Sequence, residues 1–181
     1  MDTIKAVIAT GPHVSTLKPE DTYFCRKELL ERVQRGFIII LPVDVSLLVF
    51  GERIRISHLA PVDQANIKLR LICSYSAAPD YVNPAVNAST EKFTSPNAMQ
   101  FGACLPWLMQ KIWEADPSGG PVWLFKWEIS EAFHRCLLQS ADIGAFTYVV
   151  PPLPTDISTL LCIDLVLPMG LVNSPDMFCA A

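Results

Sequence analysis

Fifteen prolines in 181 residues limit the length of the regular elements that this chain can form. Proline fixes its own φ angle, has no amide hydrogen and disfavours a helical conformation in the residue before it. Hydrophobic residues make up 51% of the chain and charged residues 18%, which rules out disorder as the default and leaves enough apolar surface for one core. We therefore expect a folded chain of short helices and short strands joined by fixed turns.

The longest apolar stretch, residues 36–50, contains Pro42 and Asp44 and is too short to span a bilayer. The first residues lack the charged and then apolar pattern of a signal peptide. We expect an intracellular protein of the cytoplasm or nucleus, without a membrane partner, so the glycosylation triplet at Asn87 is expected to be unused. The six cysteines include no C-x-x-C pair, which argues against a zinc ribbon or a redox motif.

Hydrophobic spacing and turn signals predict an α+β chain with a mixed, mainly antiparallel sheet and packed helices. The first expected helix is acidic at its start, places Phe24, Leu29, Leu30 and Val33 on one face, and ends at Gly36. A long irregular crossing is expected over residues 77–100. Helices or helical turns are expected over residues 20–34, 101–115, 131–136 and 173–179. Strands are expected over residues 37–41, 45–50, 53–57, 69–73, 122–128, 146–150 and 159–166.

The charge of the chain differs between its two parts. Residues 1–75 hold ten Lys and Arg against eight Asp and Glu, net +2, whereas residues 76–181 hold four against ten, net −6. A basic part beside an acidic part suits a protein that holds phosphate with one lobe and gathers carboxylates around metal with the other.

Two strings carry the strongest functional signal. They are KWEISEAFH at residues 126–134 and LPMGLVNSP at residues 167–175. They resemble, in order and spacing, two adjacent signature blocks of the reverse transcriptases of retrotransposons. The strings AFTYVVP at residues 145–151 and KLRLICS at residues 68–74 also resemble the family.

The resemblance implies a fragment of the polymerase right hand, made of the fingers and part of the palm. It divides the chain into a weakly ordered lead-in, a fingers-like part, a palm-like part with the first catalytic motif, a fingers-like return and the start of a second palm motif. The corresponding ranges are residues 1–18, 19–95, 96–136, 137–165 and 166–181.

The activity implied is RNA-directed DNA synthesis from dNTPs on a primer-template of RNA or DNA. Such a nucleotidyltransferase holds two Mg²⁺ ions with carboxylates at one sheet edge. Glu128 stands at the position of the catalytic, metal-binding aspartate. Its side chain is one methylene longer, which displaces the carboxylate by more than about 1 Å, and a displacement of this size can lower the rate ~10²-fold.

The resemblance also assigns the nucleotide-binding residues. Arg70 matches the arginine that contacts the triphosphate, although Ser74 replaces the usual aspartate of that strand. The backbone amides of Glu131 and Ala132 match those that receive phosphate oxygens, and Phe133 matches the ring that excludes a 2′-hydroxyl.

In the second string, Met169 and Gly170 match the turn that approaches the nucleotide, and the remaining residues match the motif that supports the template. Gly170 suits a sharp turn, and Asn, Ser and Pro suit the start of a helix. The supporting residues are Leu167, Pro168, Asn173, Ser174 and Pro175.

The chain stops at Ala181, before the Tyr/Phe-x-Asp-Asp block that carries the other family carboxylates. We therefore expect a truncated and catalytically inactive copy. One alternative is a remnant that binds nucleic acid or a protein partner without catalysis, and another is an incomplete gene model.

Overall fold

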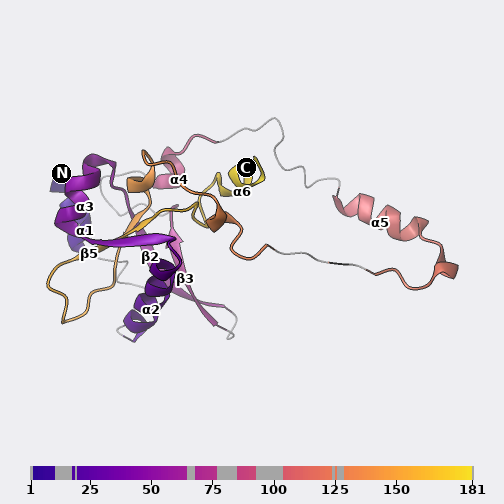
Figure 1. Ribbon diagram of the computed structural model, residues 1–181, viewed down its shortest axis with the longest axis horizontal. Helices are drawn as coiled ribbons and strands as arrows, with labels where there is room; N and C mark the ends of the chain where they lie inside the picture. Colours follow the sequence, from indigo (N-terminus) through magenta and orange to yellow (C-terminus); the bar gives the residue numbers. More distant parts are fainter. Residues whose placement is uncertain are drawn as a thin grey trace.

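The computed structural model describes residues 2–10, 18, 20–64, 68–76, 85–92, 104–123, 125 and 129–180. Within these residues five strands form one mixed sheet in the order β1-β5-β4-β2-β3, which confirms the expected α+β class (Figure 1). The strands are β1 (Ile38–Pro42), β2 (Ile56–Gln64), β3 (Lys68–Ser74), β4 (Thr147–Val149) and β5 (Leu160–Asp164). The α-helices are α1 (Asp2–Thr10), α2 (Asp21–Gln34), α3 (Val43–Phe50), α4 (Val86–Ser89), α5 (Cys104–Glu114) and α6 (Ser174–Ala180).

The sheet joins segments that lie far apart in the sequence. Strand β5 pairs antiparallel with both β1 and β4, while β2 pairs antiparallel with β3 and parallel with β4. The predicted mainly antiparallel arrangement is thus confirmed. The two parts of the chain on either side of α5 contribute neighbouring strands, so they share one core.

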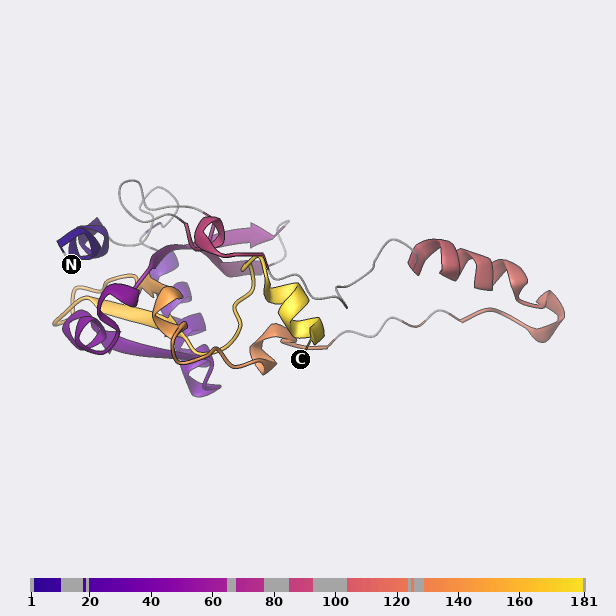
Figure 2. The same ribbon diagram turned by 90° about the horizontal axis from the view of Figure 1, so that it is seen from above.

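Helices cover both faces of the sheet (Figure 2). Successive strand residues point to opposite faces, and Tyr148 and Cys162 pack with Cys25 and Leu29 of α2 on one face. On the other face, α1 and α3 pack over the strands in a second cluster. That cluster is formed by Ile4, Ile8, Ile54, Ile56, Val149 and Leu161, with Val43, Leu47 and Phe50 against it.

Helix α2 ends where the sequence predicts. The amide of Phe37 donates to the carbonyl of Arg32, and the amide of Gly36 donates to the carbonyl of Val33. Gly36 has a φ of 73°, the left-handed conformation that closes such a helix end. The predicted apolar face is correct except for Leu30, which is exposed.

The segment expected as a strand over residues 45–50 is instead the helix α3. Its buried side is made by Val43, Leu47 and Phe50, which recur at helical spacing and pack against the second cluster. Pro42 stands before the first helical residue, and the Ser46 hydroxyl donates to its carbonyl. The apolar content of residues 45–50 suggests a strand, but the helix places Val43, Leu47 and Phe50 together against the core cluster.

Residues 2–10 lie in the stretch expected to be a weakly ordered lead-in, and they form α1. Ile4 and Ile8, one helical turn apart, are buried against the sheet and give this short helix its tertiary support. None of the described helices is long and apolar enough to cross a membrane.

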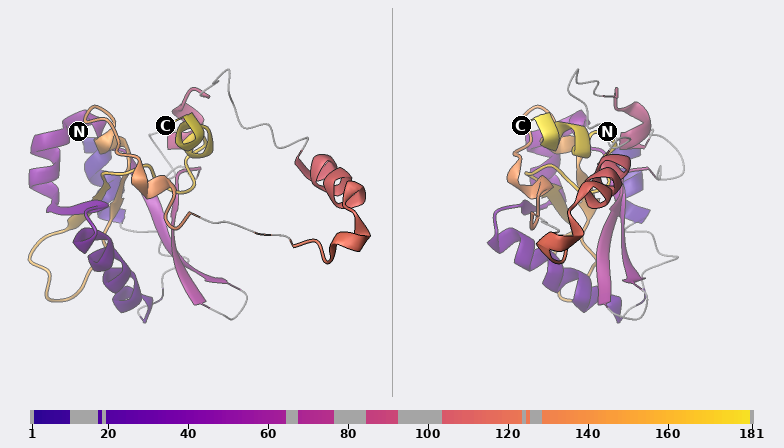
Figure 3. Two further views of the ribbon diagram at one scale, coloured as in Figure 1. Left: turned by 45° about the vertical axis from the view of Figure 1, so that its right-hand side comes forward. Right: turned by 90° about the vertical axis from the view of Figure 1, so that its right-hand side faces the viewer.

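Helix α5 forms an arm that lies well apart from the sheet (Figures 1 and 3). The side chains from Leu105 to Glu114 are all exposed, including Trp107 and Trp113. The expected strand over residues 122–128 is not present at Val122, Trp123 or Phe125, which are exposed and belong to no ladder. Apolar composition favours a strand only where a neighbour supplies backbone hydrogen bonds.

Candidate functional site

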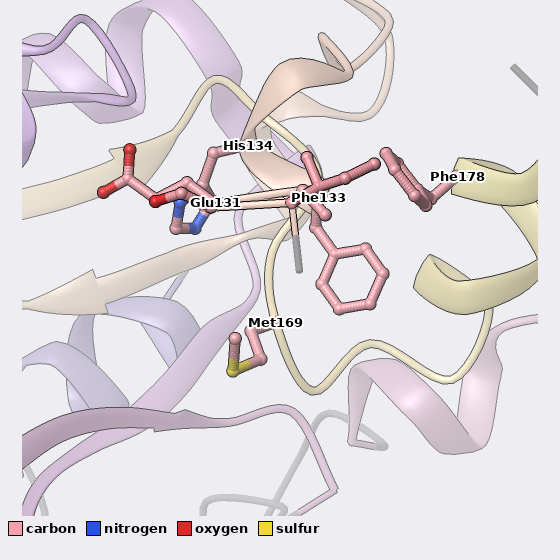
Figure 4. Close-up of a pocket in the computed structure, with 8 residues that line it drawn as sticks. Glu131, Phe133, His134, Met169 and Phe178 are labelled. Carbon is pink, nitrogen blue, oxygen red and sulfur yellow. The ribbon is translucent and has the colours of Figure 1, made fainter. Parts of the chain in front are cut away.

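A pocket of about 720 Å³ lies between the turn that follows residue 128 and the turn that precedes α6 (Figure 4). Its walls combine one continuous segment, residues 129–134, with two residues from the second string and from α6. The lining residues are Ile129, Ser130, Glu131, Ala132, Phe133, His134, Met169 and Phe178. Four residues expected to bind nucleotide, Glu131, Ala132, Phe133 and Met169, therefore share one pocket.

Residues 129–136 form the first wall as a tight turn followed by a 3₁₀ helix, Phe133–Arg135, where a helical turn was expected. Glu131 has a φ of 54°, the one non-glycine residue in the described part of the chain with a left-handed backbone. Ala132 follows in the right-handed helical region. Alternation of this kind turns successive amide groups toward one side and forms a concavity suited to an anion.

Phe133 and Phe178 form the apolar part of the pocket. Their ring centroids are 5.8 Å apart and the rings are nearly perpendicular, an edge-to-face arrangement that fixes both side chains. Both rings pack against a third core cluster that includes Tyr75, Val86 and Leu171. The two aromatic rings of the pocket are thus held in place by packing against this core cluster.

The second wall is the turn that carries Met169. Leu167 is buried, and the Ser174 hydroxyl donates to the carbonyl of Pro168 at 2.6 Å. Gly170 has a φ of 98° and lies against Tyr75, so this position requires glycine for its backbone conformation. Gly170 is adjacent to the pocket without lining it.

The end of the same string joins α6 to the rest of the chain. Helix α6 begins at Ser174, where a helix was expected from residue 173. Asn173 is buried, and its Nδ2 donates to the carbonyl of Glu91 at 2.7 Å. Pro175 occupies the first turn of α6, as proline can because this position needs no intrahelical amide bond.

Asn87 of α4 holds the turn at Gly170, a role that the sequence did not reveal. Its Nδ2 donates to the Gly170 carbonyl and to the Ser76 hydroxyl, at 2.9 and 2.8 Å. Its Oδ1 accepts from the amide of Val172 at 2.9 Å. The only sequence pattern that includes Asn87 is a glycosylation triplet. Such a triplet does not predict a contact with a residue more than 80 positions away.

His134 has a buried Nδ1 atom for which the described residues offer no hydrogen-bond partner. Its ring packs against Phe37, with centroids 4.8 Å apart. Burial lowers the pKa of His134 below its ordinary value, and the neighbouring Arg32 lowers it further. The imidazole is therefore neutral at neutral pH.

Glu131 is paired with Arg35, which caps the C-terminal end of α2. The pair joins the first wall of the pocket to α2. The Arg35 side chain is 53% exposed and the Glu131 side chain 38%, so water reaches both groups.

A buried polar group lies on β5, outside the lining of the pocket. The Asp164 carboxyl accepts from the Tyr75 hydroxyl at 2.5 Å and from the Tyr148 hydroxyl at 3.4 Å. Burial raises the pKa of Asp164 to about 6, although these hydrogen bonds and Arg32 oppose the shift. A carboxyl with two tyrosines on three separate segments gives no pattern in the sequence, so it was not predicted.

The remaining predicted site residues are not part of this pocket. Arg70 lies exposed on β3, opposite Val62, and is absent from the pocket lining. Glu128 lies outside the described residues.

No group of three or more His, Cys, Asp or Glu side chains that could hold a metal ion occurs in the described ranges. Two carboxyl groups lie in or near this part of the fold. Glu131 forms an ion pair with Arg35, and Asp164 accepts hydrogen bonds from Tyr75 and Tyr148. The described residues do not fit a two-metal site, and we derive no reaction step through a metal.

The comparisons with known proteins leave the chain without a family assignment. No protein-family model matches it, and no curated protein matches it significantly.

Proposed function

We propose that the chain is a fragment of a retrotransposon-type reverse transcriptase whose pocket binds a deoxynucleoside triphosphate. The observation that carries the proposal is the shared pocket of Phe133 and Met169. These residues come from two strings that resemble successive blocks of this family, and the tertiary structure brings them together. In this proposal the α+β body corresponds to the fingers and part of the palm.

The chemistry of the pocket supports a nucleotide as its ligand. Phe133 and Phe178 offer an apolar surface to a sugar or base, while the Glu131–Ala132 turn offers backbone amides to phosphate oxygens. Phe133 also stands at the position whose ring, in the family that the string resembles, excludes a 2′-hydroxyl, which favours dNTPs over ribonucleotides.

We propose that the chain binds dNTP without catalysing DNA synthesis. In the family, synthesis on a primer-template requires Mg²⁺ held by carboxylates, and in this chain the first of these positions holds Glu128. Its longer side chain displaces the carboxylate from the aspartate position by more than about 1 Å, enough to lower the rate ~10²-fold. Magnesium binding in this proposal depends on Glu128.

Binding of dATP and ATP to residues 1–181, measured by isothermal titration calorimetry, tests the pocket. We expect tighter binding of dATP, and we expect Phe133→Val to reduce the preference at least about fivefold, because a smaller side chain admits the 2′-hydroxyl. Phe125→Val on the exposed arm is the matched control and should leave the preference unchanged. Equal affinity of the unaltered chain for dATP and ATP would contradict the proposed gate.

Primer extension with Mg²⁺ tests the absence of catalysis. Clear incorporation of dNTPs by the purified chain would show that it is an active polymerase and would overturn this part of the proposal.

A second candidate function is a non-catalytic remnant that binds a protein partner. The observation that favours it is the exposed apolar surface of the α5 arm, where Trp107, Met109 and Trp113 are 60%, 62% and 89% exposed. If this candidate is correct, the chain associates with itself or with a protein partner, and Trp113→Ser abolishes this association. The chain then binds no dNTP. Sedimentation velocity of the two forms distinguishes it from a nucleotide-binding monomer.

A further inference from the structure

The ion pair between Arg35 and Glu131 lies at the edge of the candidate pocket. Glu131 lines the pocket, and Arg35 reaches its carboxylate from the end of α2. Both side chains are substantially exposed, and ion pairs of this exposure contribute little to stability. The pair can therefore open when a better ligand for the guanidinium arrives.

The position of Arg35 does not depend on the ion pair. Its amide donates to the carbonyl of Glu31 at 3.2 Å as part of the α2 end. Two residues further on, Phe37 packs its ring against His134, which itself lines the pocket. These contacts keep the backbone of Arg35 beside the pocket, so its guanidinium stays within reach of a ligand when Glu131 releases it.

The other described charge on this wall, that of Arg135, is positive, and so is that of Arg32 on α2 near His134, although the chain as a whole carries a net charge of −4. Arg135 Nε donates to the carbonyl of Ser130 at 3.4 Å. Besides the effect of burial, the positive charge of Arg32 lowers the pKa of His134. A local excess of arginine favours an anionic ligand.

We propose that Arg35 is the residue that recognises the phosphates of the ligand, by exchanging the Glu131 carboxylate for a terminal phosphate of a nucleoside triphosphate. This inference rests on the proposed function. Without ligand, Glu131 holds the guanidinium and neutralises it. With ligand, a phosphate takes both guanidinium donors in a bidentate contact, which is stronger than an exposed carboxylate pair.

Titration of inorganic tripolyphosphate and of dATP, in magnesium-free buffer at low ionic strength, tests the exchange. Arg35→Gln should weaken both ligands about tenfold or more, because a charge-assisted bond to phosphate is lost. Arg35→Lys should restore part of the affinity. Glu131→Gln should strengthen binding about two- to fivefold, because no ion pair must open first.

The double variant Arg35→Gln with Glu131→Gln separates exchange from simple neutralisation. If Arg35 only cancels the charge of Glu131, removing both restores the affinity of the unaltered chain, which would overturn the proposal. If Arg35 binds phosphate, the double variant stays weak.

The matched control is the pair Lys111–Glu114 on α5, with side chains 54% and 45% exposed. Lys111→Gln and Glu114→Gln remove one positive and one negative charge at a site away from the pocket. They should change neither the affinity for tripolyphosphate nor the affinity for dATP. Equal effects at both pairs would show a general effect of net charge and contradict the proposal.

The outcomes also separate this inference from the proposed function. If Phe133→Val alters the preference for dATP over ATP while the Arg35 variants change nothing, the nucleotide pocket stands and the exchange fails. If tripolyphosphate responds to Arg35 but dATP is not preferred over ATP, the anion site stands and the deoxynucleotide pocket fails. No binding of either ligand overturns both.

Discussion

Asp164 carries a carboxyl group inside the protein, between β1 and β4, where water cannot solvate its charge. Its hydrogen bonds come from Tyr75 and Tyr148, and Tyr75 also lies against Gly170 of the pocket turn. Burial raises the pKa of this group to about 6, well above its ordinary value. The folded state therefore binds this proton more tightly than the unfolded chain does.

This residue predicts a pH dependence of stability. Between about pH 4 and pH 6 Asp164 holds its proton in the folded state more than in the unfolded state, so its contribution to stability is fully present below this range and is lost as the pH rises through it. The contribution of Asp164 over this window is about 3 kcal/mol. Urea unfolding at pH 4 to 7 should show a decline that Asp164→Asn removes.

Asp142→Asn, at an exposed position, serves as the control and should keep the decline. Parallel pH curves for the unaltered chain and Asp164→Asn would show that the buried carboxyl does not titrate in this window.

At the scale of elements, α4 and the turn before α6 act together although Asn87 and Gly170 lie 83 positions apart in the sequence. Asn87 makes two hydrogen bonds between them, to the carbonyl of Gly170 and from the amide of Val172. The turn places Met169 in the pocket, so a short helix outside the sheet determines the second wall.

Asn87→Ala should therefore lower the free energy of unfolding by about 1–3 kcal/mol, because it leaves the Gly170 carbonyl and the Val172 amide without this partner. Urea unfolding measures the loss. Asn87→Asp keeps the acceptor for Val172 and should lose less. A stability equal to that of the unaltered chain would mean that water replaces the amide without cost.

At the scale of the whole molecule, the sheet and its covering helices form the stable body, and α5 stands outside it. The described side chains of α5 are exposed, so they bury little apolar surface against the core. The pocket is formed by residues of the body from Ile129 onward.

Replacement of residues 104–125 by a short Gly/Ser linker should leave the unfolding free energy and the pocket unchanged. The body should still unfold in one cooperative transition, because its three core clusters contain no residue of α5. Thermal unfolding followed by circular dichroism measures this. Loss of cooperativity would show that the arm packs on the body in solution.

Features that depend on nearby residues could be predicted from the sequence alone. Gly36 ends α2 and Ser174 begins α6 because capping is determined within a few residues. The strand from Leu69 to Cys73 and the turn at Gly170 were also correct for local reasons. The two motif strings, likewise local, identified four of the eight residues that line the pocket.

Only the tertiary structure decided the features that depend on distant partners. Residues 45–50 became helical because Val43, Leu47 and Phe50 meet the same core cluster. Val122 and Trp123 formed no strand because no neighbouring strand accepts their backbone bonds in the described ranges. The Arg35–Glu131 pair joins residues 96 positions apart, a contact that no local pattern encodes. The sequence by itself therefore determined helix ends and turns and suggested a function, and long-range packing and hydrogen bonding determined the pocket.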